Sequence, residues 1–165
     1  MEEQLMKFAS RRPKMGHQPG LKLQRGVSLL EVLIAVLVLS LGLLGVAGLQ
    51  TANIRNTQSA HQRTMAVLLA SSMAERIRAN ATAAVNGSFV LPLRCSAMSP
   101  GASIQSVEQA SWLTEIMTAF GNSGTSCGGV TYNAATRTYI VTVQWDDSRA
   151  LGGSTTMTIT HVARI

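Results

Sequence analysis

The sequence predicts an α+β protein in which a long N-terminal helix packs on a small antiparallel sheet. Three observations support this fold class. Residues 27–49 form a long apolar run. Residues 50–80 contain neither proline nor glycine and carry apolar residues at helical spacing. Residues 139–145 and 156–162 each alternate with a period of two. With 165 residues, the chain has the length of one ordinary domain.

The apolar run at residues 27–49 is long enough to cross a membrane. Its only ionisable side chain is Glu31. A helix of this length spans roughly 35 Å, and the hydrocarbon core of a bilayer measures about 30 Å. A buried core helix is the alternative, but a single small domain offers little protein to cover so much aliphatic surface. We therefore expect a membrane-spanning helix.

The positive charge of the chain is concentrated ahead of this run. The formal net charge is +6, and six basic residues precede residue 27. From Val27 onward, eight arginines stand against six acidic residues, which leaves a net charge of about +2. A basic segment before a hydrophobic helix stays on the cytoplasmic side, so the C-terminal part should lie outside the cytoplasm. The charge distribution gives no reason to expect a nucleic-acid partner.

A glycine, Gly26, stands directly before the apolar run, whereas a secretory signal has its small-residue cleavage site after it. The string RGVSLLE at residues 25–31 resembles the class III signal of type IV prepilins and pseudopilins. The resemblance implies that a prepilin peptidase removes residues 1–26 and methylates the new N-terminus, Val27. Valine stands here where phenylalanine is more usual in the family. An uncleaved signal anchor with a chance glycine is the alternative.

Glu31 is the one carboxylate in the apolar helix, and a charge at the bilayer centre costs about 2.5 to 3.5 kcal/mol on insertion scales. The prepilin resemblance implies that Glu31 pairs, after cleavage, with the α-amino group of a neighbouring subunit. Because an unpaired charge in a packed core costs several kcal/mol, such a pair would select one register of subunit assembly. A glutamate at headgroup level without a partner is the alternative.

Two later segments are similar to the minor pilins called PilV. They are GLLGVAGLQ at residues 42–50 and AVLLASSMAERIRAN at residues 66–80. The resemblance implies a pilin-like fold and a minor subunit that takes part in type IV pilus assembly or initiation. Its implied partners are other major and minor pilins, the prepilin peptidase and the inner-membrane assembly machinery. A type II secretion pseudopilin, or a pilus-tip module that binds a surface or DNA, is the alternative.

Residues 50–80 are predicted to continue the helix beyond the membrane. Met65, Leu69, Met73 and Ile77 recur every four residues and form an apolar stripe, whereas residues 50–63 are mainly polar. The stripe should therefore pack on a globular head. The predicted regions are a leader at 1–26, a transmembrane and filament-core helix at 27–49, an amphipathic continuation at 50–80 and a periplasmic head at 81–165.

The head is predicted to contain one helix and a small sheet. A short strand is expected at residues 89–91. A helix should follow, with Ser106 and Gln109 as its N-terminal cap and Gly121 at its end. Residues 122–129 predict a loop. The alternation then predicts antiparallel strands at 139–145 and 156–162, joined by a turn at 146–153.

Cys95 and Cys127 are the two cysteines of the chain, and the predicted orientation places both in the oxidising periplasm. We expect a disulfide between them, and the pilin resemblance supports it because many pilins have one in their distal half. The bond would close a loop with 31 intervening residues and stabilise the head by roughly 3 to 4 kcal/mol in the chain-entropy model. Two free thiols are the alternative.

The sequence contains no motif typical of an enzyme, such as a phosphate-binding loop, a hydrolase nucleophile elbow or a dinucleotide fingerprint. His61, His161 and two cysteines do not indicate a metal site. We therefore expect no catalytic residue, cofactor or metal. The expected location is the inner membrane, with the N-terminus cytoplasmic and the head periplasmic, and afterwards the pilus fibre.

Overall fold

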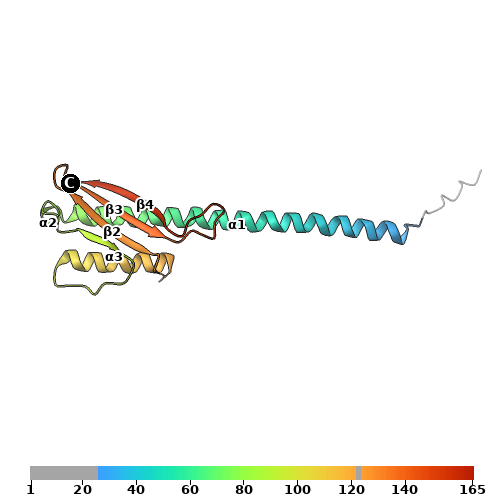
Figure 1. The fold of residues 1–165 in the computed structure, drawn as a ribbon, viewed down its shortest axis with the longest axis horizontal. Coiled ribbons are helices and arrows are strands. Elements are labelled where there is room, and N and C mark those ends of the chain that lie inside the picture. Colours follow the sequence, from blue (N-terminus) through green and yellow to red (C-terminus); the bar gives the residue numbers. More distant parts are fainter. Residues whose placement is uncertain (1–25, 122–123) are drawn as a thin grey trace, which may run out of the picture. The chain divides into compact units, whose positions relative to one another are not determined.

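The computed structural model describes residues 26–121 and 124–165, so most of the predicted leader lies outside the described residues. The chain divides into two units between Leu41 and Gly42. The elements, drawn in Figure 1, are α1 (Leu29–Ala79), α2 (Ala81–Ala84), β1 (Leu91–Arg94), α3 (Ile104–Phe120), β2 (Cys127–Asn133), β3 (Thr138–Trp145) and β4 (Met157–Arg164). The single helix predicted over residues 27–80 is confirmed as α1.

Residues 26–41 consist of a short non-helical stretch and the first turns of α1. The carbonyl oxygen of Ser28 accepts hydrogen bonds from the N–H groups of Glu31 and Val32, at 3.0 and 3.2 Å, and the helix begins at Leu29. Every residue of this unit that the structure describes is exposed. By length and composition, α1 could cross a membrane, and none of its most apolar window is buried within the chain.

In the second unit, the four strands form one antiparallel sheet in the order β1-β2-β3-β4. Strands β3 and β4 confirm the two predicted from alternation, and Val141 lies opposite Val130 of β2 and His161 of β4. The fold is α+β, with a long N-terminal helix packed on a small antiparallel sheet, as the sequence predicts.

One face of the sheet packs against the second part of α1 and against α3. Its residues on β3 are Tyr139, Val141, Val143 and Trp145, all with no exposed surface. The predicted stripe of α1 joins the same core through Leu69, Met73 and Ile77. Between these lie Ala66, Ala70 and Ala74, small residues with no exposed surface. Full burial of one large apolar side chain stabilises a fold by about 1.5 to 3 kcal/mol, so this interface holds the head together.

The prediction of a loop at residues 122–129 is wrong for residues 127–129, because β2 begins at Cys127. The strand was not predicted because it contains two consecutive glycines, Gly128 and Gly129, and glycine is depleted in strands. A Cβ added at Gly128 would come within 2.6 Å of the Trp112 ring, and one at Gly129 within 3.1 Å of the Leu93 backbone. Close packing therefore requires glycine here, which the local pattern does not reveal.

The short strand predicted at residues 89–91 is displaced to Leu91–Arg94. Phe89 instead fills the core, and Pro92 lies within β1. Proline cannot donate a ladder hydrogen bond, but an edge strand needs only one bonded side, and β1 is at the edge of the sheet.

The predicted cap of the second helix is also wrong. Ser103 caps α3 by accepting a hydrogen bond from the N–H of Ser106 at 3.2 Å. The hydroxyl of Ser106 accepts from the N–H of Gly101 at 2.6 Å, and the buried Gln109 donates to the Phe89 carbonyl at 3.0 Å. The predicted end at Gly121 is confirmed, with a φ of 90° that favours glycine.

Candidate assembly segment and head contacts

The predicted processing site lies just before α1. Gly26 and Val27 have no regular secondary structure, and Val27 is 69% exposed. A Cβ added at Gly26 would meet no atom within 4 Å among the described residues. The bond between Gly26 and Val27 therefore lies in an open, non-helical stretch.

Glu31 lies in the first turn of α1. A carboxylate here interacts favourably with the positive end of the helix dipole, a contribution of typically 0.3 to 1 kcal/mol at exposed sites. No ion pair involves Glu31 in the part of the chain that the structure describes. The helix end thus gives a modest local reason for a carboxylate and leaves its charge available to another group.

The apolar side chains of the first part of α1 form an exposed surface. The exposed fraction reaches 90% at Leu29 and 70% at Leu44. Monomeric soluble proteins rarely expose contiguous apolar surfaces larger than a few hundred Å². A helix of this kind needs lipid or other protein around it, so this surface is the principal candidate for interaction.

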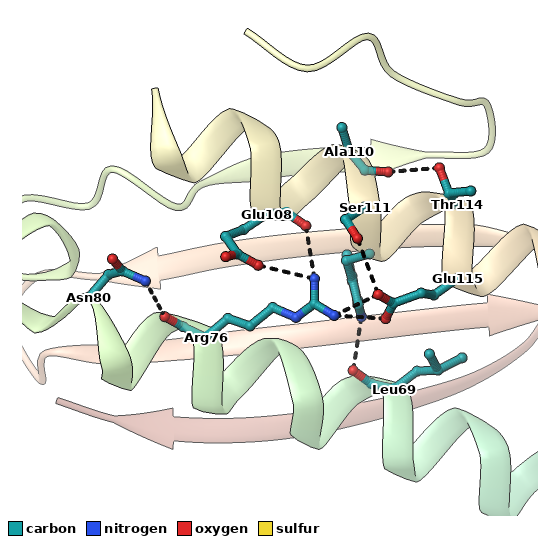
Figure 2. Close-up of polar contacts among 9 residues, drawn as sticks. Leu69, Arg76, Asn80, Glu108, Ala110, Ser111, Thr114 and Glu115 are labelled. Atoms are coloured by element: carbon teal, nitrogen blue, oxygen red, sulfur yellow. Dashed lines mark hydrogen bonds and ion pairs between the residues drawn. The ribbon is translucent and has the colours of Figure 1, made fainter. Parts of the chain in front are cut away.

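A polar cluster of Arg76, Glu108 and Glu115, called the Arg76 clamp below, joins α1 to α3 in the head (Figure 2). Arg76 of α1 donates to Glu108 at 3.1 Å and to both carboxylate oxygens of Glu115 at 2.6 and 2.9 Å. Asn80 donates its side-chain amide to the Arg76 carbonyl at 2.9 Å. The guanidinium donates from Nη1 to Glu108 and from Nη2 to Glu115, so charge-assisted hydrogen bonds to two carboxylates fix how α3 lies on α1.

Trp112 adds a directional contact to this clamp. Its indole N–H donates to the carbonyl of Leu69 at 2.8 Å, and its ring has no exposed surface. The sequence pattern did not predict these contacts of Arg76 and Trp112. The spacing of seven residues between Glu108 and Glu115 places them on one face of α3, which is a signal, but the sequence does not identify Arg76 as their partner.

The turn after β3 is tied to α1 through Asp147. Asp147 is 3% exposed, its Oδ2 accepts from the Ser59 hydroxyl at 2.7 Å, and Arg63 lies 3.8 Å away. The sequence predicts that Asp146 and Asp147 are turn residues and that α1 packs on the head only after residue 63. Packing begins earlier, at Ser59, because this buried carboxylate requires a donor.

The neighbouring Asp146 is exposed, and its side chain contacts only the turn that contains it. Its carboxylate accepts from the N–H of Ser148 at 2.9 Å, and this hydrogen bond lowers the pKa of Asp146 below its usual value. In the core, burial raises the pKa of Tyr139, whose hydroxyl donates to the Ala84 carbonyl at 2.7 Å. These two groups stabilise local structure and are not brought together.

The predicted disulfide is confirmed between Cys95 and Cys127, with their Cα atoms 4.0 Å apart. It links the segment after β1 to the start of β2. Within residues 26–121 and 124–165, no group of three or more histidine, cysteine or acidic side chains is placed to hold a metal ion. His61 is exposed on α1 and His161 is half-buried on β4.

Comparison with known proteins identifies the N-terminal segment. Residues 21–47 match the family model of the prokaryotic N-terminal methylation motif. No curated protein and no solved structure matches the chain. The motif implies processing by a prepilin peptidase and assembly with pilus machinery, fits anchoring in the inner membrane and indicates a structural subunit rather than an enzyme. Motif and fold together support a type IV pilin-like protein or pseudopilin.

Proposed function

We propose that the chain is a minor pilin, similar to PilV, which takes part in assembly or initiation of a type IV pilus. The observation that carries the proposal is the combination at the start of α1: a glycine in an open stretch, then an uncovered apolar helix with one carboxylate in its first turn. The matched methylation motif covers the same residues.

In this proposal, the peptidase cuts between Gly26 and Val27 on the cytoplasmic side of the inner membrane. Removal of the leader creates a new α-amino group at Val27, which is then methylated. The carboxylate of Glu31 binds the α-amino group of a neighbouring subunit, and the uncovered part of α1 exchanges lipid contacts for contacts with other pilin helices. Since Glu31 has no ion-pair partner among the described residues, it is available for this role.

A pseudopilin of a type II secretion system is the second candidate, because its subunits have the same kind of leader. The PilV-like segment at residues 66–80 favours the pilus by resemblance. However, Arg76 and Asn80 of this segment form contacts within the head, so their roles explain the packing of α3 rather than a choice of machine.

The direct test is the mass of the N-terminal peptide from membranes of cells with and without the prepilin peptidase. We expect a peptide that begins with methylated Val27, and only in the presence of the peptidase. A leader still attached in both strains would contradict the processing step and leave a plain membrane anchor.

A second experiment separates the two candidates. The chain should be recovered with sheared surface fibres from cells that have the pilus machinery, and deletion of the secretion machinery should leave the recovered amount unchanged. Recovery that depends on the secretion machinery alone would favour the pseudopilin.

A further inference from the structure

A hollow of about 490 Å³ lies where the turn between β2 and β3 meets the end of β4. Two arginines line it, Arg137 before β3 and Arg164 at the end of β4, together with Thr136 and Thr138. The sheet register brings the arginines together, because Arg164 lies opposite Thr138 and the Ile165 N–H donates to the Arg137 carbonyl at 3.1 Å.

Both guanidinium groups are free within the described part of the chain. Neither has a hydrogen-bond or ion-pair partner there, in contrast to Arg76, which has two carboxylates. The residues that line the hollow include no acidic side chain, and strands β1 to β4 contain none either. Two cationic side chains and no acidic side chain therefore line this hollow, beside the terminal carboxylate of Ile165, with which neither arginine forms an ion pair.

The backbone at Arg137 also favours a role for its side chain. Its φ of 49° makes it the one non-glycine residue with positive φ among those described. Asparagine and glycine adopt this conformation more readily than arginine does, so the turn itself gives no preference for arginine. A long cationic side chain is held at a position where a smaller residue would suit the backbone better.

We propose that Arg137 and Arg164 form a binding site for carboxylate groups of an acidic segment of another protein. Guanidinium groups bind carboxylates bidentately, and the adjoining outer face of the sheet is neutral and suits a polypeptide. Its side chains are Thr131, Ile140, Thr142, Thr158, Thr160 and Val162. Two cations release few counterions from a nucleic acid, so the site favours a protein over DNA. The inference does not depend on the proposed role in pili.

The test uses the full chain in detergent micelles and a fluorescein-labelled decapeptide of alternating glutamate and glycine, with fluorescence anisotropy as the measurement. The variant R137N/R164Q removes both charges, and asparagine tolerates the positive φ. The control R55Q/R94Q removes the same charge from two exposed arginines that also lack an ion pair among the described residues. We expect at least tenfold weaker peptide binding by R137N/R164Q and unchanged binding by the control.

Three outcomes would overturn the proposal: no peptide binding by the unaltered chain, equal losses in the two double variants, or no loss in R137N/R164Q. A labelled oligothymidylate of ten nucleotides tests whether the site binds the phosphates of a nucleic acid instead of carboxylates. If it binds more tightly than the peptide and loses binding in R137N/R164Q, the site recognises phosphate and the assignment to protein is wrong. Should that variant fail to fold, as judged by tryptophan fluorescence, R164Q alone keeps the turn intact and is expected to weaken binding at least threefold.

Discussion

Two stretches of α1 share one helical backbone but have opposite relations to their surroundings. In the uncovered stretch, residues 29–51, every side chain is exposed although most are apolar. The covered stretch, residues 59–79, contains all the buried residues of the helix. Its less apolar sequence is buried because the sheet and α3 lie against it. Burial therefore depends on which partner surface a chain contains, and for the uncovered stretch that surface belongs to a membrane or another molecule.

The largest effect is expected from substitution of Glu31, which tests whether the uncovered stretch takes part in assembly through this carboxylate. We expect Glu31→Ala to reduce the amount of chain in sheared pili by at least tenfold, because the proposed ion pair that aligns neighbouring subunits would be lost. The measurement is quantitative immunoblotting of pilus and membrane fractions.

The matched control is Glu75→Ala, which removes an exposed carboxylate from the covered stretch. It should leave pilus incorporation unchanged. Wild-type amounts of Glu31→Ala in pili would refute the role of Glu31 in assembly.

The next effect compares the same substitution in the two stretches. Ile77 has no exposed surface, whereas Ile34 is 52% exposed. We expect Ile77→Ala to lower the free energy of unfolding of the head by about 2 to 5 kcal/mol, because it leaves a cavity in the core. Ile34→Ala should leave it unchanged. Guanidinium unfolding of the full chain in detergent, followed by tryptophan fluorescence, reports on the head because Trp112 and Trp145 are both buried there.

A smaller effect compares two arginines within the covered stretch. Arg76→Met removes the cation between Glu108 and Glu115 and should cost about 1 to 2 kcal/mol, a range reduced because these side chains are 22 to 38% exposed. Arg78→Met breaks only an exposed pair with Glu75 and should change stability by less than about 0.5 kcal/mol. Equal effects of the two substitutions in the same unfolding assay would show that the clamp does not hold α3.

The smallest effect concerns pH. The folded pKa of Asp146 is lowered by its hydrogen bond from Ser148, so its stabilising contribution is present above its unfolded pKa and is lost as the pH falls through the folded value. Unfolding measured at pH 7 and pH 3 should show a slightly smaller loss of stability for Asp146→Asn than for the unaltered chain. An equal or larger loss would contradict this contribution.

Much of the fold follows from residues whose burial is periodic. Tyr139 to Trp145 alternate because one face of β3 is buried, and Leu69, Met73 and Ile77 recur because one side of α1 is covered. β2 was not predicted, because the close approach of the Trp112 ring requires glycine at position 128 and this contact joins distant parts of the chain.

The candidate sites divide in the same way. The disulfide between Cys95 and Cys127 could be predicted because the chain has just two cysteines and an expected oxidising environment. Gly26, Val27 and Glu31 were found through a local motif and their roles stay predictions. Arg76 and Asp147 were missed as contact residues because each meets its partners only after the chain has folded.

The simple order of the sheet has a kinetic consequence. Strands β2, β3 and β4 each pair with the strand next to them in the chain, and such hairpins close within about 1 to 10 μs. The connection from β1 to β2 is longer, since it contains all of α3 and ends at the cysteine that joins Cys95. Because thiol oxidation takes seconds to hours, the slowest step in maturation of the head is expected to be the formation of this disulfide, at a rate set by the available oxidant.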